Sequence, residues 1–267
     1  MKKLRERSIH KFEDAVTNED AVRATEKVIA VSDGAGGGGV YADKWSAYLL
    51  EHLPEEPLKD FETFDKWVDG IWEAFYNNHE EIAKQKGGML LNKFYDEGSF
   101  ATLVAVWKTA EHNYFWATYG DSVAFHYNRK TGMLEHSFGR LADFKNPPYL
   151  INYIAPLQAE GYKCGEFETD DSSIVFVASD TLAQYILTMY EASKRNQFEE
   201  ELNEVLQSHT RYASLVQSAL TIKAISFDKA LRKLLKTAKR KHSFKDHLAA
   251  CKRKGLLGHD DYSFASF

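Results

Sequence analysis

The sequence predicts an α+β fold, in which antiparallel strands and helices occupy separate stretches of the chain. Four short apolar runs follow one another between Ala101 and Leu134 with turn residues between them, which indicates an antiparallel meander. Helical periodicity dominates residues 41–86 and 182–254. With 267 residues, of which 44% are hydrophobic, the chain can bury a large core, so we expect a single domain over residues 1–267 that carries at most one insertion.

The first buried strand is expected at residues 28–31, where four apolar residues lead into Ser32, Asp33 and a glycine-rich run. An aspartate in this position is held by the strand and left unshielded by the loop, which suits a metal or phosphate site. An earlier short strand is expected near residues 8–13. Hairpin pairing before the first buried strand would bring Glu19 and Asp20 to the strand end that carries Asp33.

The glycine-rich loop also fits a dinucleotide site, because Gly34, Gly36 and Gly39 have the spacing G-x-G-x-x-G between a strand and a helix. The second parallel strand of such a site is not expected, since another helical pattern follows Pro57. The absence of a Gly-Lys-Ser/Thr triplet excludes a P-loop. A tight turn that merely requires glycine is the remaining alternative.

The other elements follow from periodicity and turn residues. Helices are expected at residues 41–52 and 59–86, side by side on a sheet, because aromatic residues recur at helical spacing in the second. The expected strands of the meander are residues 101–108, 114–119, 123–127 and 133–134. Residues 138–167 are expected to be irregular. A buried strand at 172–178 then runs into Asp180, and a last strand follows Asp260 and Asp261.

The charge is distributed unevenly along the chain. Residues Lys229–Lys254 hold eleven Lys and Arg and one acid, so this segment carries +10 and the remainder about −15 of a net −5. The segment could engage an acidic partner, or it could be the solvated face of a helix whose buried side carries Leu231 and Leu235. Because the body is acidic, nucleic acid is an unlikely partner.

Two further features bear on where the protein works. The sequence shows neither a signal-peptide pattern nor an apolar run of the ~20 residues that a membrane span requires, so no membrane contact is expected. Cys164 and Cys251 are far apart and lack zinc-ligand spacing, which indicates reduced thiols and a cytoplasmic location.

Acidic residues recur at strand ends throughout the chain. If these ends converge, the carboxylates repel one another and keep their protons unless cations lie among them. Oxygen donors without Cys or His favour Mg²⁺ or Mn²⁺ over zinc. The motifs are Asn18-Glu19-Asp20, Ser32-Asp33-Gly34, Gly120-Asp121-Ser122, Ser179-Asp180 and Asp260-Asp261.

In this order and with these neighbours, the motifs resemble those of the metal-dependent serine/threonine protein phosphatases, the type 2C (PPM) family. The resemblance runs from about Asn18 to Phe264. It implies a four-layer α-β-β-α sandwich of two antiparallel sheets flanked by helices, with the metals at one end of the sheets. The matching motifs are Asp33-Gly34-Ala35-Gly36-Gly37, Gly120-Asp121-Ser122, Ala178-Ser179-Asp180-Thr181 and Asp260-Asp261-Tyr262-Ser263.

The resemblance also implies roles for single residues. Asp33 would bridge two Mn²⁺ or Mg²⁺ ions, and the Gly34 carbonyl would bind one of them. Asp180 and Asp260 would complete the pair, and Asp121 with Asp180 would hold a possible third ion. Asp20 would hold metal-bound water with Glu19 in support. Asp33, Asp20 and Asp180 would thus be the catalytic residues.

The implied activity is hydrolysis of phosphoserine and phosphothreonine on an unidentified phosphoprotein. A water that bridges two cations ~3.5–4 Å apart would attack phosphorus in line, and the cations would neutralise the phosphoryl oxygens.

The sequence departs from the family pattern at several positions. Ala15 stands where many members have a phosphate-gripping arginine, Ala35 where eukaryotic members often carry histidine, and Thr181 and Gln184 where the family usually has glycine and an acid. The spacing from Asp180 to Asp260 indicates a helical, basic insertion at about residues 198–241. These departures keep an alternative open: a catalytically weakened phosphatase-like module that binds or regulates a partner.

Overall fold

The computed structural model describes residues 4–12, 17–37, 39–208 and 210–267. Within these residues the chain forms two five-stranded sheets in which every neighbouring pair is antiparallel. The first sheet has the order β1 (Arg5–Ile9), β10 (Tyr262–Ser266), β9 (Ser173–Ala178), β6 (Val123–Asn128), β7 (Met133–His136). The second has the order β2 (Ala21–Ala24), β3 (Val28–Ser32), β4 (Leu103–Lys108), β5 (Asn113–Tyr119), β8 (Tyr162–Glu168).

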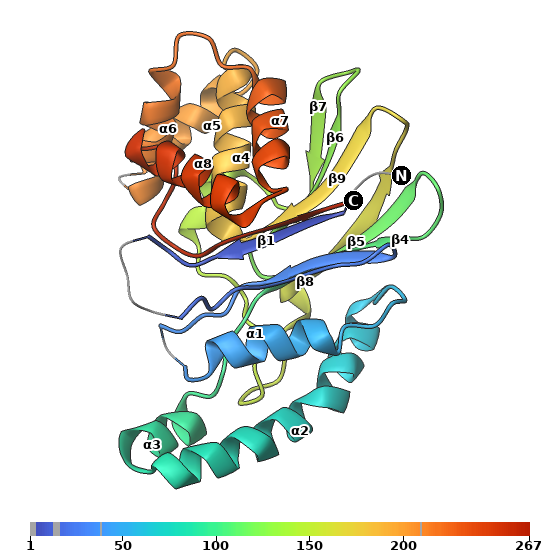
Figure 1. Cartoon of the computed structure of the whole chain (residues 1–267), viewed down its shortest axis with the longest axis vertical. Helices are drawn as coiled ribbons and strands as arrows, with labels where there is room; N and C mark the ends of the chain where they lie inside the picture. The colour runs from blue at the N-terminus through green and yellow to red at the C-terminus, as the bar shows by residue number, and fades with distance from the viewer. Residues whose placement is uncertain (1–3, 13–16, 38, 209) are drawn as a thin grey trace.

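Helices cover the two outer faces of the sheet pair, as Figure 1 shows. On the side of the β2–β8 sheet lie α1 (Ala42–Glu51) and α2 (Phe61–Lys86), and α3 (Gly88–Asp96) packs against α2. A second group of helices lies on the β1–β7 sheet: α4 (Asp180–Ser193), α5 (Glu199–Gln207), α6 (Arg211–Leu220), α7 (Phe227–Thr237) and α8 (Lys241–Arg253). The expected α-β-β-α sandwich is therefore confirmed.

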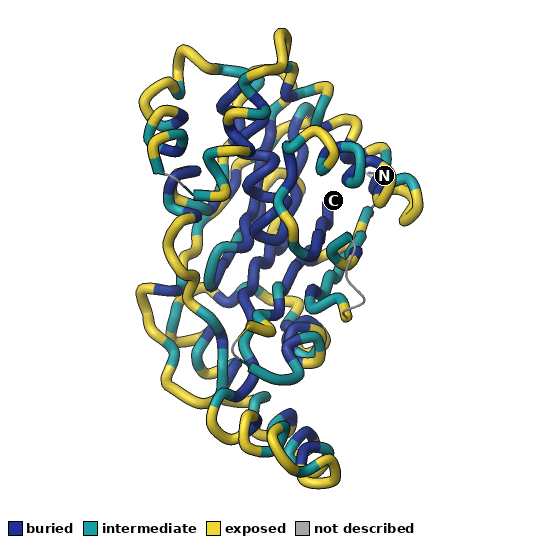
Figure 2. The backbone as a smooth tube through the Cα atoms, turned by 90° about the vertical axis from the view of Figure 1, so that its left-hand side faces the viewer, coloured by how far each residue is buried: buried dark blue, intermediate teal, exposed yellow. Residues whose placement is uncertain are grey.

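The core explains why the first four residues of β3, Val28 to Val31, are all apolar. Ile29 and Val31 point into the layer between the two sheets, whereas Val28 and Ala30 point toward α1 and α2. Because successive side chains of a strand face opposite sides, a strand covered on both faces needs a continuous apolar run. Figure 2 shows the buried strands running through the middle of the molecule.

The second helix has the expected aromatic face and a side-chain cap at its start. The Asp60 carboxylate accepts a hydrogen bond from the Thr63 backbone N–H at 2.7 Å, which starts the helix at Phe61 rather than at residue 59. Phe64, Val68 and Phe75 are buried against α1 and the β2–β8 sheet, as expected. The α2 helix ends at Gly87, whose φ of +61° suits glycine.

Two elements were not predicted, and one strand was misplaced. The β8 strand lies in the stretch expected to be irregular; it pairs with β5 alone, so its residues are largely polar and lack a strand pattern. The α3 helix buries only Phe94, which leaves little apolar periodicity to detect. The first strand begins at Arg5 rather than near Ser8, because an edge strand with two arginines carries no apolar signal.

The predicted insertion at 198–241 corresponds to α5, α6 and α7. Their buried residues join the same core as α4, α8 and the β1–β7 sheet, so these helices are part of the sandwich's outer layer. Leu231, Leu234 and Leu235 are buried, as the alternative interpretation of the basic segment expected, and its cations lie on the outside. Cys164 and Cys251 are free thiols. In the described part of the chain, no helix is both long and apolar enough to cross a membrane.

Glu191 in α4 gives a pH-dependence prediction. Its side chain is buried, and burial together with nearby Glu201 raises the pKa of the carboxyl from 4.5 to about 8. The folded protein therefore keeps a proton that the unfolded chain releases above pH 4.5, so stability falls as pH rises between these values. We expect the free energy of unfolding to decline there by about 1.4 kcal/mol per pH unit from this group. Glu191→Gln should remove that decline in urea unfolding at pH 5 to 8; an unchanged decline would contradict the assignment.

Candidate metal centre

Six of the seven predicted site residues line one pocket of about 480 Å³ at one end of the two sheets: Glu19, Asp33, Gly34, Asp121, Asp180 and Asp260. The seventh, Asp20, is buried beside Asp33 and Asp180. The residues come from the turn before β2, the end of β3, the β5–β6 turn, the start of α4 and the loop before β10. The structure thus brings together side chains that are up to about 240 positions apart in the sequence.

Strand register brings these residues to the same end. Ala21 pairs with Ser32, so Asp20 and Asp33 leave β2 and β3 at adjacent positions. Ala178 lies between Phe264 of β10 and Val123 of β6. The residues just outside these three strands are therefore Asp180, Asp260 and Asp121, and they converge because antiparallel neighbours begin and end together.

Burial and mutual repulsion perturb the carboxyl groups. Burial raises the pKa values of Asp20 and Asp33 well above their ordinary range, and the neighbouring acids add to the effect. The same causes raise the pKa of Asp121 to about 8 and that of Asp180 to about 6. Such a cluster holds protons at neutral pH unless a cation replaces them.

The donor set fits a hard divalent cation. Carboxylates line the pocket together with the backbone of Gly34, and its described lining includes neither His nor Cys. Both carboxylate oxygens of Asp20 are buried, and the side chains beside them are those of Ser263 and of the acid Asp33. Buried carboxylate oxygens are costly unless donors, a cation or a proton satisfy them.

The carboxylates would have to rotate to share an ion. As they lie, no three His, Cys, Asp or Glu side chains in the described ranges are arranged to hold a metal. One Asp180 oxygen accepts a hydrogen bond from the Thr181 backbone N–H, and Asp260 Oδ1 accepts one from the Asp261 N–H at 2.9 Å. Because of these two hydrogen bonds, one carboxylate oxygen of Asp180 and one of Asp260 point toward the neighbouring backbone.

The glycine-rich loop serves close packing around the site. A Cβ on Gly34 would lie 2.6 Å from the Glu19 carbonyl oxygen and 2.7 Å from that of Ala42, and a Cβ on Gly36 would collide with the Glu19 carboxylate. The dinucleotide interpretation is wrong, because β3 belongs to an antiparallel sheet and no βαβ unit follows it.

This packing predicts that Gly34→Ala is destabilising. The added methyl would meet two carbonyl oxygens of fixed backbone, so we expect a loss of about 1–3 kcal/mol in the free energy of unfolding. Gly37→Ala is the matched control, because a Cβ at Gly37 meets nothing within 4 Å. Urea unfolding of both variants checks the prediction, and equal stabilities would contradict it.

Several pocket residues have no counterpart in the sequence prediction. Arg211 and Tyr212 reach the pocket from the start of α6, and Lys11 and Lys145 also line it. Arg211 Nη2 donates to the Tyr212 hydroxyl at 3.2 Å. Burial acts to lower the pKa of Arg211, but Tyr212, Asp180 and Asp260 outweigh it and raise the value. No sequence motif marks any of the four, and Arg211 and Tyr212 come from the segment interpreted as an insertion.

Asp261 has a positioning role rather than a place in the pocket lining. Its two carboxylate oxygens accept the backbone N–H groups of Lys11 and Glu19, both at 2.7 Å. These two hydrogen bonds hold the loop before β2 against the start of β10. The Glu19 carbonyl in turn accepts Gly34 N–H at 3.2 Å, which links the loop to the glycine run.

The departures from the family pattern can be placed in part. Ala15 lies outside the described residues. Gln184 is one turn along α4 from Asp180, and its side-chain amide lies 3.5 Å from an Asp180 oxygen. The Gln184 amide can therefore donate a hydrogen bond to Asp180, whereas an acidic side chain at position 184 would repel the Asp180 carboxylate.

Comparison of the structure with solved structures gives consistent matches to bacterial phosphatases. The serine/threonine phosphatase Stp1 of Staphylococcus aureus aligns over 100% of this chain and 94% of its own, with a TM-score of 0.52 and 14% identity. A bacterial serine phosphatase aligns over 99% and 96%, with a TM-score of 0.52 and 14% identity. This chain has the fold of the type 2C phosphatases.

The matches to solved structures span nearly the whole chain. PppA of Pseudomonas aeruginosa aligns over 98% of this chain and 96% of its own, with a TM-score of 0.50 and 15% identity. No protein-family model matches the sequence, and no curated protein matches it significantly. At such low identity the likeness concerns the type 2C fold alone.

Proposed function

We propose that the protein is a Mg²⁺- or Mn²⁺-dependent phosphatase that hydrolyses phosphoserine and phosphothreonine on a protein substrate. The observation that carries this proposal is the convergence of carboxylates from five separate loops on one pocket. Their mutual repulsion opposes folding, and it is relieved if the pocket holds divalent cations. The type 2C fold supports the same conclusion.

Asp33, Asp180 and Asp260 are the proposed main metal ligands, with the Gly34 carbonyl beside Asp33. Asp121 lies near Asp180 and is the candidate for a third ion, and Asp20 and Glu19 are the proposed supporting acids. Two bound divalent ions would supply an activated water and neutralise the phosphoryl oxygens. Asp20, which is buried beside Asp33, would accept a proton from that water.

Arg211 is the proposed contact for the substrate phosphate. It lines the pocket with the acids, and its planar guanidinium can donate two parallel hydrogen bonds to a phosphate group. With alanine at position 15, this arginine from α6 could perform the gripping role that the resemblance assigned to that position.

One observation favours the alternative, a phosphatase-like module with weakened turnover that binds or regulates a partner. Asp180 is engaged by the Thr181 N–H and lies beside the Gln184 amide, and both donors compete with a cation for its oxygens. Metal binding without hydrolysis of any phosphopeptide would support this second function.

The deciding experiment measures metal content and turnover on the same purified sample. We expect hydrolysis of an aryl phosphate and of phosphoserine and phosphothreonine peptides with Mn²⁺ or Mg²⁺, and no hydrolysis in EDTA. Equal turnover in EDTA would contradict the metal-dependent mechanism. A sample that binds metal but leaves all of these substrates intact would favour the binding module.

A further inference from the structure

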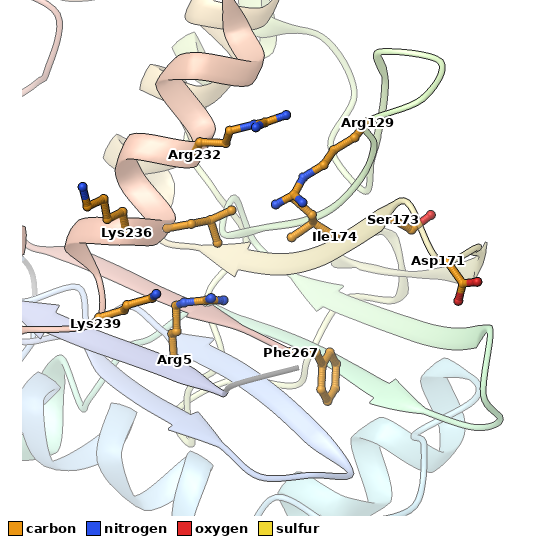
Figure 3. Close-up of a pocket in the computed structure, with 10 residues that line it drawn as sticks. Arg5, Arg129, Asp171, Ser173, Ile174, Arg232, Lys236, Lys239 and Phe267 are labelled. Atoms are coloured by element: carbon orange, nitrogen blue, oxygen red, sulfur yellow. The ribbon is translucent and has the colours of Figure 1, made fainter. Parts of the chain in front are cut away.

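A second pocket, of about 250 Å³, lies at the other end of the β1–β7 sheet (Figure 3). The β9 strand begins at this pocket with Ser173 and ends at Ala178, just before Asp180 of the metal centre. Six residues of extended strand span roughly 20 Å. The two pockets are therefore separate sites. Five cationic side chains line the second one: Arg5, Arg129, Arg232, Lys236 and Lys239.

These cations come from three parts of the fold. Arg5 belongs to β1, and Arg129 to the β6–β7 turn. Arg232, Lys236 and Lys239 come from α7 and the residues after it, one helical turn apart, so they project from one face. Figure 3 shows Arg129 and Arg232 above the β9 strand and Arg5 and Lys239 below it. The basic segment of the sequence thus contributes three of the five cations, and a strand and a turn of the β1–β7 sheet contribute the other two.

The positive charge of this pocket is poorly compensated by protein groups. Among the described lining residues Asp171 is the one acid, and Arg232 is paired with Asp228 at 2.7 Å. Among the residues that the structure describes, Arg5 Nε is buried without a hydrogen-bond partner, and Arg5 Nη1 donates to the Ser266 hydroxyl at the long distance of 3.4 Å. Burial and the charge of Arg129 lower the pKa of Arg5. A bound anion would satisfy the open donor and relieve this repulsion.

Part of the pocket wall is apolar. Ile174, Leu235 and Phe267 line it and are buried. Apolar surroundings lower the local dielectric constant and strengthen the attraction between the cations and an anion. The pocket volume lies below the about 300–1,000 Å³ of sites for drug-sized ligands, which favours a compact group.

We propose that this basic pocket binds a phosphate group, with the guanidinium groups of Arg5 and Arg129 as its main donors. Guanidinium donors match phosphate oxygens in pairs, and Lys236 and Lys239 add charge at the rim. The group can belong to inorganic phosphate or to a phosphorylated side chain of a protein segment. This phosphate-binding site does not depend on the metal centre, so it can be tested separately from the proposed phosphatase activity.

The test is isothermal titration calorimetry of the full chain in EDTA, which prevents hydrolysis. The ligands are inorganic phosphate, a phosphoserine peptide and the same peptide with serine. The variant is Arg129→Glu, whose side chain is exposed, so folding should be preserved. Lys66→Glu on α2, in the opposite outer layer, makes the same charge change at another exposed position and is the control.

We expect a phosphate ligand to bind the native protein and the Lys66→Glu variant with equal affinity, and Arg129→Glu to weaken binding at least about tenfold. The double variant Lys236→Gln/Lys239→Gln should also weaken it. Binding of inorganic phosphate would identify the free ion as a sufficient ligand, and binding of the phosphopeptide alone would identify a phosphorylated segment. No binding of either ligand, or equal affinity in Arg129→Glu, would overturn the proposal.

Discussion

Asp33→Asn is expected to abolish metal-dependent turnover and, in EDTA, to raise the melting temperature of the protein. Asp33 is a half-buried acid close to Asp20, Asp121, Asp180 and Asp260. A neutral amide would bind a divalent cation more weakly than the carboxylate, so we expect turnover to fall by about a thousandfold or more, equivalent to about 4 kcal/mol of transition-state stabilisation. The same change removes a half-buried group that repels its neighbours, which should stabilise the metal-free fold by about 1–2 kcal/mol.

Two measurements on each protein test this pair of effects. Turnover of an aryl phosphate with Mn²⁺ gives the first, and thermal unfolding with EDTA or Mn²⁺ gives the second. Mn²⁺ should raise the melting temperature of the native protein but have much less effect on the variant, because ligands stabilise the state that binds them. Asp69→Asn, at an exposed position on α2, is the control. A variant that keeps Mn²⁺-dependent turnover, or that melts lower in EDTA, would contradict the account.

Arg211→Ala is expected to lower kcat/KM for phosphopeptides by about tenfold to a hundredfold. The arginine is the proposed phosphate contact, and a charged hydrogen-bonded contact contributes about 1.5–3 kcal/mol. Because the change removes a cation from an acidic pocket, affinity for Mn²⁺ should not decrease. Arg211→Lys should recover part of the activity, since it restores charge without the paired donors.

Steady-state kinetics and Mn²⁺ titration of the same preparations separate these effects. Arg195→Ala serves as the control, because Arg195 is exposed and does not line the pocket. An unchanged kcat/KM in Arg211→Ala would show that Arg211 does not contact the substrate phosphate. A parallel loss of Mn²⁺ affinity would indicate that it acts through the carboxylates and not on the substrate.

The strands could be predicted from the sequence where they are buried, and they were missed or misplaced where they lie at an exposed sheet edge. Apart from one terminal serine each, the β3 and β9 strands are apolar because they are covered on both faces, so their patterns and the acids that follow them were evident. The β8 and β1 strands lie at sheet edges and carry polar residues, which gives them no detectable periodicity. The short α3 helix buries a single aromatic residue and was missed for the same reason.

The sequence motifs predicted which acids gather, but not what surrounds them. Asp33, Asp180 and Asp260 could be named because each follows or precedes a recognisable strand, and antiparallel pairing brings such ends together. Arg211 could not be named, because its place depends on how α6 packs over the sheet. The second pocket could not be predicted either, because Arg5 and Arg129 are far from the basic segment in the sequence and approach it only in the tertiary fold.

The central claim is that divalent cations occupy the space between the carboxylates of Asp33, Asp180 and Asp260. The most direct measurement is the anomalous scattering of crystals grown with Mn²⁺. We predict two or three manganese peaks in the pocket, bonded to oxygens of these three aspartates, with the side chains of Asp180 and Asp260 turned away from the backbone N–H groups they now accept. A saturated crystal with no manganese in this pocket, or with the three carboxylates directed apart, would contradict the claim.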